Sequence, residues 1–297
     1  MARRVILRIL LRVRSGMNER IFKYHGLGND FVVMDRRASG WDIDADTAIR
    51  LCDRRRGIGA DGVLVLLPEP GTAARMVVHN SDGSTAEMCG NGLRCAVKYL
   101  VDHSADRPAT IDVATGAGIL SCAVDYGEDG AREIEVAMGP ARLVAPNLPS
   151  RTSGQPFVDA EVPGHPGLKG TAISMGNPHL VLSACGPGQA QRLGPLLERH
   201  PDFPDRTNVE FVERQGDGLK VTVWERGCGL TQACGTGACA AVAAWVHRGL
   251  LEPDAWIPVE LPGGVLRIKV ARDLGAVTLR GPAAFVFEAV VPIASDK

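Results

Sequence analysis

Two cysteines stand in the same short context in the two halves of the chain. Cys89 begins Cys-Gly-Asn-Gly, and Cys234 begins Cys-Gly-Thr-Gly 145 residues later. Apolar residues at helical spacing follow each segment, so each cysteine is expected at the N-terminus of a helix. The backbone N–H groups and the dipole at such an end favour an anion. They are expected to lower the pKa of a thiol and to suit a carboxylate ligand.

The recurrence extends beyond the cysteines. The matching positions are Gly28-Asn29 with Gly176-Asn177 (offset 148), Asp61 with Asn208 (offset 147), and Leu93, Ala96, Val97, Leu100 and Val101 with Ala238, Ala241, Val242, Trp245 and Val246 (offset 145). An offset of about half the chain indicates a duplicated domain.

The local patterns predict the same elements in both halves. Short apolar runs (31–35, 62–68 and 75–80; then 179–183, 209–213 and 219–224) are typical of strands, and each Cys-Gly-x-Gly turn opens a buried helix. Six prolines between 140 and 170 mark the crossover. We therefore expect an α+β protein of two pseudo-symmetric domains, 17–139 and 140–281, with the active site between them. Residues 1–16, rich in arginine, are expected to be a disordered tail or an upstream-start extension.

Two thiols related by such a duplication could act on opposite faces of one carbon. One thiolate would remove a proton from an amino-acid α-carbon, and the opposite thiol would return a proton on the other face. Backbone N–H groups at the helix ends would hold the carboxylate while charge develops. This chemistry is racemisation or epimerisation, and it requires no pyridoxal phosphate; we expect no cofactor.

Composition excludes several other classes. The 33 Lys and Arg residues nearly balance 34 Asp and Glu, and aromatics make up 5%, which argues against a nucleic-acid partner. No uncharged apolar run approaches the ~18 residues of a membrane span. No signal peptide is visible, so a reducing, cytoplasmic setting is expected. The sequence contains no Cys-x2-Cys pair, the spacing typical of a zinc site, so no metal site is expected. The other cysteines are expected to be small buried filler, Cys228 least so: Cys52, Cys95, Cys122, Cys185, Cys228 and Cys239.

Six segments taken together resemble one family. They are HGLGNDFVVMD, NSDGSTAEMCGNGLRCA, SMGNPHLV, LGPLLERHPDFPDRTNVEFV, WERG and QACGTGACAA, in order between Lys23 and Gly281. The chain is similar to diaminopimelate epimerases. The resemblance implies a cofactor-independent epimerase that converts LL-2,6-diaminopimelate to the meso form in lysine and peptidoglycan precursor synthesis. It also implies two domains, each a curved, mostly antiparallel sheet around a central helix, with residues 282–297 returning to the first.

The same resemblance implies roles for individual residues. Cys89 and Cys234 correspond to the acid/base pair, and His179 and Glu225 to groups that tune or orient the thiols. The implied substrate-binding residues are Asn29, Asn80, Gly90, Asn91, Asn177, Asn208, Glu225, Arg226, Gly235 and Thr236. An aromatic that supports dimers in the family corresponds to Phe287, so a homodimer is expected.

The chain departs from the family pattern at two positions. Gly62 stands where some members carry Gln, and Leu230 stands where a Glu usually precedes the second cysteine. Two alternatives stay open. One is a racemase of another amino acid, such as proline or hydroxyproline, on the same scaffold. The other is a non-catalytic thiol redox or binding protein.

Overall fold

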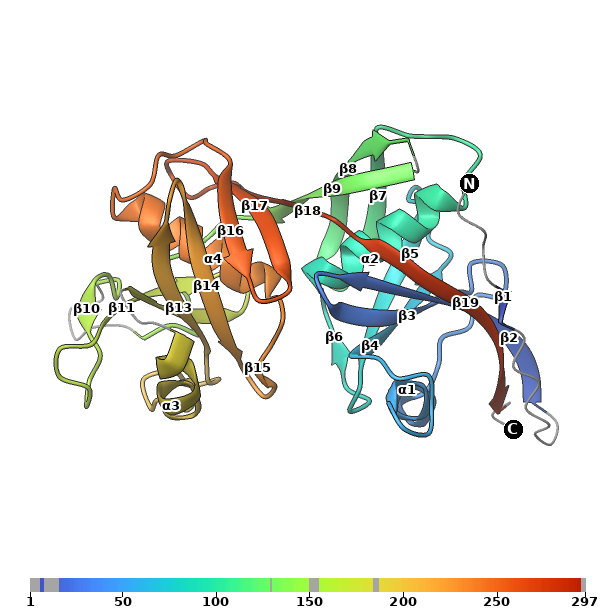
Figure 1. Cartoon of the computed structure of the whole chain (residues 1–297), viewed down its shortest axis with the longest axis horizontal. Coiled ribbons are helices and arrows are strands. Elements are labelled where there is room, and N and C mark those ends of the chain that lie inside the picture. The colour runs from blue at the N-terminus through green and yellow to red at the C-terminus, as the bar shows by residue number, and fades with distance from the viewer. Residues whose placement is uncertain (1–5, 8–15, 129, 150–154, 184–186, 295–297) are drawn as a thin grey trace. The chain divides into compact units, whose positions relative to one another are not determined.

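A computed structural model describes residues 6–7, 16–128, 130–149, 155–183 and 187–294. The chain forms two compact units, the first from 1–136 with 282–297 and the second from 137–281 (Figure 1). Each unit is a sheet with one helix buried against it and a second, shorter or more exposed helix beside it.

The first unit is a mostly antiparallel sheet. Its strands are β2 (Gly16–Gly26), β3 (Asn29–Asp35), β4 (Gly62–Leu67), β5 (Ala74–Asn80), β6 (Thr85–Ala86), β7 (Thr110–Thr115), β8 (Gly118–Gly127) and β9 (Gly130–Gly139). β3 and β4 are parallel, as are β5 and β7, whereas β2–β3, β4–β5, β7–β8 and β8–β9 are antiparallel. The C-terminal strand β19 (Ala284–Ala294) pairs antiparallel with β2, and the two lie side by side in Figure 1.

The second unit repeats this order of pairing. Its strands are β10 (Ala160–Glu161), β11 (Lys169–Ser174), β12 (Pro178–Ser183), β13 (Asn208–Gln215), β14 (Gly218–Glu225), β15 (Gly229–Leu230), β16 (Ile257–Leu261), β17 (Gly264–Val270) and β18 (Val277–Gly281). β12–β13 and β14–β16 are parallel; β11–β12, β13–β14, β16–β17 and β17–β18 are antiparallel. The predicted duplicated α+β architecture is confirmed.

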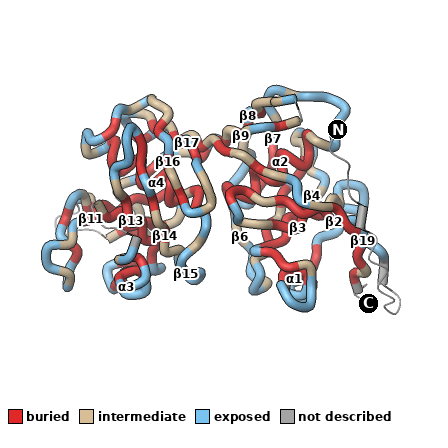
Figure 2. Tube along the Cα trace, in the orientation of Figure 1, coloured by how far each residue is buried: buried red, intermediate tan, exposed pale blue. Residues whose placement is uncertain are grey.

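One helix in each unit is buried almost all round. α2 (Gly90–Asp102) is buried from Gly90 to Val101, and α4 (Gly235–His247) is buried from Gly235 to Val246 except at Thr236. Both helices are red along nearly their whole length in Figure 2. A helix surrounded by sheet needs no polar face, which explains the Ala-rich sequence of α4. Each cysteine turn therefore begins the most deeply buried helix of its unit.

The other two helices follow equivalent strands. α1 (Ala45–Cys52) connects β3 to β4, and α3 (Pro187–Glu198) connects β12 to β13. Each helix covers a separate apolar cluster. In the first unit Ala48 and Leu51 of α1 pack with Val32 and Val63, and in the second Leu193 and Leu197 of α3 pack with Phe211.

The strand registers correct one sequence alignment. Phe31 of β3 is paired with Gly62 of β4, and His179 of β12 is paired with Asn208 of β13. Asn208 therefore corresponds to Gly62, and its alignment with Asp61 is wrong by one residue. The connection between the paired strands is two residues shorter in the second unit, so the offset falls from 148 to 146 along it.

Parts of the expected N-terminal tail lie outside the described residues, namely 1–5 and 8–15. Of the rest, Ile6–Leu7 forms strand β1, parallel to β19, and Gly16 begins β2. Among the cysteines expected to be buried, Cys52, Cys95, Cys122 and Cys239 are buried, whereas Cys228 is exposed. Cys228 lies in the turn between β14 and β15, which explains the error; Cys185 is outside the described residues. No helix in the described part of the chain is long and apolar enough to cross a membrane.

Candidate active site

Cys89 is the N-cap residue of α2. Its backbone is extended (φ −138°, ψ 113°), and its sulfur accepts a hydrogen bond from the Gly92 N–H at 3.4 Å. The side chain is half-buried. Helix geometry directs the N–H groups of the first turn, including those of Gly90 and Asn91, out of the helix end. The turn therefore offers a sulfur and an anion-binding backbone together.

Cys234 occupies the same position on α4. Its backbone is extended (φ −117°, ψ 110°), and its sulfur accepts from the Gly237 N–H at 3.3 Å. The Thr236 hydroxyl lies 3.6 Å from the sulfur. The residue is only 7% exposed. The two candidate catalytic residues are thus equivalent caps of equivalent helices, but Cys234 is the more deeply buried.

Burial raises the pKa of the Cys234 thiol well above its ordinary value, and a negative charge on the nearby side chain of Glu225 or Glu210 raises it further. The hydrogen bonds from Thr236 and from the Gly237 N–H act in the opposite direction but are outweighed. The expectation that the helix end lowers this pKa is therefore wrong for Cys234. This environment favours the thiol, the form that donates a proton, over the thiolate.

A chain of hydrogen bonds orients two of the three predicted asparagines of the first unit, Asn29 and Asn91. Arg94, fully buried, donates to Asn91 Oδ1 at 2.8 Å, and Asn91 Nδ2 donates to Asn29 Oδ1 at 3.0 Å. Asn29 Nδ2 in turn donates to Asp61 at 2.7 Å, and Asp61 also accepts from Arg54 at 2.7 Å. A cation at one end and a carboxylate at the other fix which way each amide points.

Asn80 makes different contacts. It ends β5, where it is paired with Gly62, and its side chain donates to Ser84 Oγ at 2.9 Å. This contact differs from the hydrogen bond that joins Asn91 to Asn29. Its predicted role in binding substrate stays a prediction.

In the second unit, hydrogen bonds connect three predicted residues to the cysteine. His179 Nε2 lies 3.0 Å from Asn177 Oδ1, and Asn177 Nδ2 donates to Thr236 Oγ1 at 3.3 Å. Thr236 follows Gly235 in the first turn of α4, beside Cys234. His179 is 0% exposed. A buried side chain therefore supports the polar edge of this turn.

The remaining predicted residues cluster around the turn after β14. Glu225 accepts from Thr231 Oγ1 at 2.7 Å. Asn208 accepts from the backbone N–H of Arg226 at 2.9 Å and donates to the Pro178 carbonyl at 3.0 Å. The buried amide of Asn208 thus holds two backbone segments together, and the exposed guanidinium of Arg226 donates to the Asp205 carbonyl at 2.9 Å.

Both departures from the family pattern have a structural setting. A Cβ at Gly62 would lie 2.7 Å from the His79 carbonyl, so a side chain there requires the backbone to shift. Leu230 is 41% exposed on β15, and the next residue, Thr231, supplies the hydrogen bond to Glu225. The sequence reasoning missed Thr231, Arg94 and the Glu210 partner of His179 described below.

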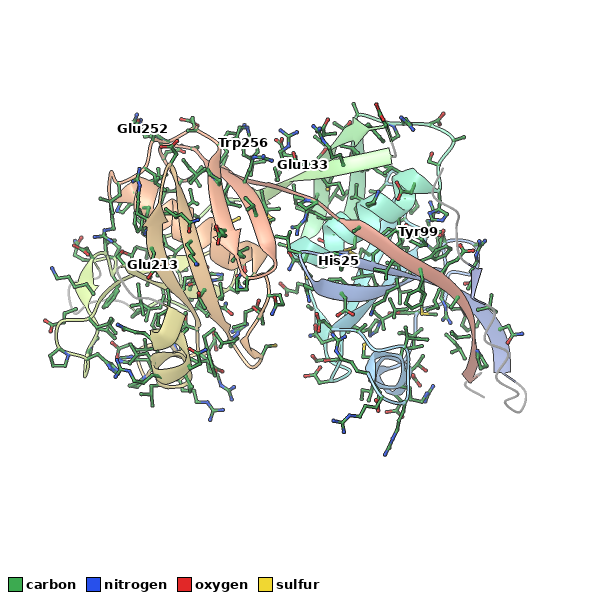
Figure 3. All side chains as sticks on the ribbon, in the orientation of Figure 1. His25, Tyr99, Glu133, Glu213, Glu252 and Trp256 are labelled. Carbon is green, nitrogen blue, oxygen red and sulfur yellow. The ribbon has the colours of Figure 1, made fainter. Side chains whose placement is uncertain are left out.

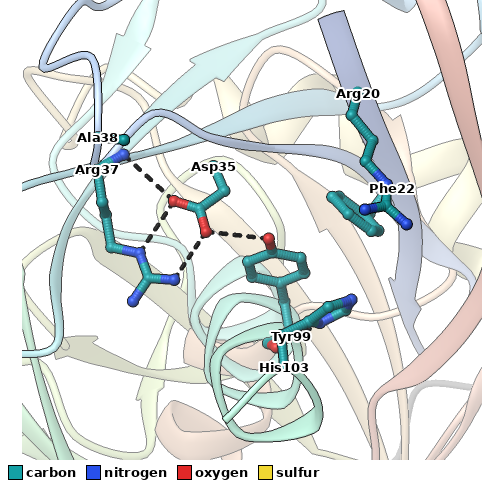
Figure 4. Close-up of a pocket in the computed structure, with 7 residues that line it drawn as sticks. All are labelled: Arg20, Phe22, Asp35, Arg37, Ala38, Tyr99 and His103. Atoms are coloured by element: carbon teal, nitrogen blue, oxygen red, sulfur yellow. Dashed lines mark hydrogen bonds and ion pairs between the residues drawn. The ribbon is translucent and has the colours of Figure 1, made fainter.

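Away from the cysteine turns, the described residues include potential metal ligands and form a surface pocket. No cluster of three or more potential metal ligands occurs among the residues described. A surface pocket near the C-terminal end of α2 contains Tyr99 and His103 together with the Asp35–Arg37 ion pair of 2.7 Å (Figure 4). Tyr99 donates to Asp35 at 3.0 Å, so the charges of this pocket are already paired. None of the predicted site residues lines it.

The family model for diaminopimelate epimerase matches residues 21–144 and 171–286. The diaminopimelate epimerase of Synechococcus elongatus is 42% identical over 288 residues, which is 94% of this chain and 100% of the relative. That of Desulforudis audaxviator is 44% identical over 272 residues, 90% and 96% of the two chains. The chain belongs to the diaminopimelate epimerase family. Membership of this family makes the protein an enzyme of the isomerase class.

Solved structures share the fold of this family member at low sequence identity. A phenazine biosynthesis protein of the PhzF family from Bacillus anthracis superposes with a TM-score of 0.72 at 16% identity, covering 93% of this chain and 100% of that one. A probable proline racemase from Agrobacterium radiobacter gives 0.68 at 16% identity, with 94% and 93% covered. These likenesses confirm the fold.

Proposed function

We propose that this enzyme inverts one α-carbon of LL-2,6-diaminopimelate to give the meso isomer, without a cofactor, with Cys89 and Cys234 as the acid/base pair. One observation carries the proposal: each unit presents a cysteine as the N-cap of its central buried helix. The curated relatives of 42–44% identity that bear the name diaminopimelate epimerase support the choice of substrate.

The chemistry assigns the two sulfurs complementary protonation states. One cysteine, as thiolate, takes the α-proton and becomes a thiol; the other, as thiol, gives its proton to the opposite face and becomes a thiolate. Before the next forward turnover the first sulfur loses its proton to solvent and the second takes one from solvent, which restores the first state. The deep burial of Cys234 supports its role as the thiol that gives a proton when LL-diaminopimelate is the substrate. Cys89 is then the base that removes the α-proton.

The N–H groups of Gly90, Asn91, Gly235 and Thr236 would hold the reacting carboxylate, because helix N-termini stabilise the negative charge that develops as the proton leaves. Asn29, Asn80, Asn177, Asn208, Glu225 and Arg226 would surround the remainder of the zwitterion. The exposed guanidinium of Arg226, which can donate two parallel hydrogen bonds, suits the distal carboxylate of the substrate. The proposal requires the two helix ends to face one stereocentre.

A panel of amino acids tests the substrate. Reduced protein is incubated with LL-diaminopimelate, L-proline and trans-4-hydroxy-L-proline, and the stereoisomers are separated by chiral chromatography. We expect inversion of diaminopimelate alone. Inversion of proline or hydroxyproline in its place would support the racemase alternative. Cys89→Ser and Cys234→Ser should each abolish turnover. If the chain were a non-catalytic thiol protein, the wild-type protein itself would show no turnover of any of these amino acids.

Two expectations, on oligomeric state and on location, accompany this proposal. We propose that the enzyme acts as a homodimer in the cytoplasm. Phe287, the aromatic to which a dimer role was assigned, packs partly buried against the core of the first unit. Sedimentation equilibrium of the reduced protein measures the oligomeric state directly, and a monomer at micromolar concentration would contradict the first expectation.

A further inference from the structure

The two cysteine turns differ in the residue that lies behind them. A Cβ built on Gly92 would lie 3.0 Å from Leu64 Cδ2 and 3.6 Å from Cys89 Sγ. A Cβ built on the equivalent Gly237 would lie 2.9 Å from Glu210 Oε1 and 3.3 Å from Cys234 Sγ. Leu64 lies two residues after Gly62, and Glu210 lies two residues after Asn208. Because Gly62 and Asn208 are equivalent in the two units, Leu64 and Glu210 are equivalent too. The first turn is thus backed by a methyl group and the second by a carboxyl group.

The neighbour of this residue differs in the same way. Phe31 in the first unit corresponds to His179 in the second, and both are buried. His179 Nδ1 lies 2.7 Å from Glu210 Oε1, and both side chains are 0% exposed. One unit therefore has an apolar pair where the other has two titratable groups. A fold that packs well with the apolar pair does not need the polar pair for stability, because burying polar groups costs free energy unless they are fully bonded.

The polar pair ends a line of contacts that reaches Cys234. The line runs from Glu210 to His179 (2.7 Å), to Asn177 (3.0 Å), to Thr236 (3.3 Å) and to the Cys234 sulfur (3.6 Å). Asn177 Nδ2 donates to Thr236, so Asn177 Oδ1 accepts from His179 Nε2. His179 therefore carries a proton on Nε2, and the Thr236 hydroxyl, which accepts from Asn177, has its own proton available for a hydrogen bond to the sulfur 3.6 Å away.

Which atom donates in the hydrogen bond between Glu210 and His179 depends on which of the two side chains carries the proton. Glu210 Oε2 is buried and has no hydrogen-bond partner among the described residues. A carboxylate with an unbonded, unsolvated oxygen is unfavourable, whereas a neutral acid with a carbonyl oxygen there is tolerated better. Glu225 and Cys234 are the other titratable groups nearby. A negative charge on Glu210, added to one on Glu225, would disfavour a thiolate at Cys234.

We propose that Glu210 is a positioning residue that acts as a neutral acid: it donates its proton to His179 Nδ1, which fixes the His179 proton on Nε2 and, through Asn177 and Thr236, directs a hydrogen bond to the Cys234 sulfur. This asymmetry distinguishes Cys234 from Cys89. The inference deepens the proposed epimerase mechanism and rests on it for its catalytic consequence, but not for the geometry.

The proton position can be measured without turnover. In protein labelled with 15N-histidine, long-range 1H–15N spectra distinguish the two neutral tautomers from imidazolium. His179 is assigned by the signal lost in His179→Phe, which introduces the residue of the first unit. We expect His179 at pH 7.5 to be neutral, with the proton on Nε2 and Nδ1 as a hydrogen-bonded acceptor. An imidazolium, or a proton on Nδ1 alone, overturns the proposal in the wild-type protein.

Three variants test the catalytic consequence. Glu210→Leu introduces the residue of the first unit and removes the donor; loss of one hydrogen bond of ordinary net strength lowers kcat/KM by about tenfold. Glu210→Gln keeps a donor to Nδ1 and is expected to lower it less than about threefold. Glu213→Gln, on the same strand and labelled in Figure 3, makes the same chemical change outside the line and is the control.

The outcomes separate the two proposals. Wild-type activity in Glu210→Leu, or an equal loss in Glu210→Gln and Glu210→Leu, overturns the role of Glu210 as a neutral donor. Absence of epimerisation by the wild-type protein overturns the proposed function, while the histidine spectra still decide the position of the proton.

Discussion

The contrast between the two cysteine turns gives a prediction at their third helical residue. Gly237→Ala and Gly92→Ala add the same methyl group at equivalent positions of α4 and α2. The Gly237 methyl would lie 2.9 Å from Glu210 Oε1 and 3.3 Å from the sulfur of Cys234. The Gly92 methyl would lie 3.0 Å from Leu64 Cδ2 and 3.6 Å from the sulfur of Cys89. Only at Gly237 must both the carboxyl group and the sulfur move.

The magnitudes follow from these distances. Restoring ordinary contact at Gly237 requires Glu210 to move by about 0.5 Å, in a core where overpacking costs about 1–3 kcal/mol. Alanine regains about 1 kcal/mol of helix propensity over glycine. We therefore expect Gly237→Ala to lower the free energy of unfolding by at most about 2 kcal/mol. Displacing a reacting sulfur by a few tenths of an ångström should lower kcat/KM about tenfold or more.

Gly92→Ala is the matched control. A leucine methyl can yield by rotation and the Cys89 sulfur is already at ordinary contact distance, so we expect a stability change below about 1 kcal/mol and a loss of activity below about threefold. Guanidinium denaturation and initial rates of epimerisation measure both quantities. Wild-type kcat/KM in Gly237→Ala, or an equal loss in both variants, would refute the reasoning.

Three further predictions concern stability and redox state. Arg94→Met removes the hydrogen bonds that a fully buried guanidinium donates to Pro282, Gly90 and Asn91 and should lower the free energy of unfolding by about 2–4 kcal/mol in guanidinium denaturation; a change below about 1 kcal/mol would contradict it. Burial raises the pKa of Asp30, but hydrogen bonds from Arg54 and Lys23 outweigh it and lower that pKa from 3.8 to about 2. The carboxylate therefore stabilises the fold fully above pH 3.8 and loses this contribution as the pH falls through 2; Asp30→Asn should cost about 1 kcal/mol at pH 6 and progressively less as the pH falls from 3.8 through 2, and a pH-independent difference would count against the assignment. Oxidation should inactivate the enzyme reversibly through a Cys89–Cys234 disulfide, which mass mapping detects; full activity with that disulfide formed would be inconsistent with the mechanism.

Much of the architecture could be predicted because the duplication left a local pattern. The apolar runs at 31–35, 62–68 and 179–183 lie in β3, β4 and β12, and the apolar residues after Cys89 and Cys234 lie on buried helices. Each pattern depends on residues close in sequence, for which period and burial are directly related. The same locality explains why both cysteines could be expected as helix caps.

Properties that depend on packing could not be predicted in this way. The partner of His179 is Glu210, on a neighbouring strand 31 residues away, and the strand register that joins them is not visible in either segment. The alignment of Asn208 with Asp61 failed for the same reason. The pKa of Cys234 is set by burial more than by the helix end, and burial is a property of the folded unit. A corrected alignment would have matched Glu210 with Leu64, the equivalent residue of the first unit, and an acid at a position that is apolar in the other half is the sequence signal that could have revealed it.

The most direct test of the central claim, that one cysteine removes a proton and the other returns one, is epimerisation of LL-diaminopimelate in deuterium oxide, stopped at low conversion and analysed by mass spectrometry. A thiol carries a single proton, so the product should contain one deuterium at the inverted carbon while the recovered substrate contains none. Equal deuterium in the recovered substrate and product, or product without deuterium, would contradict the mechanism.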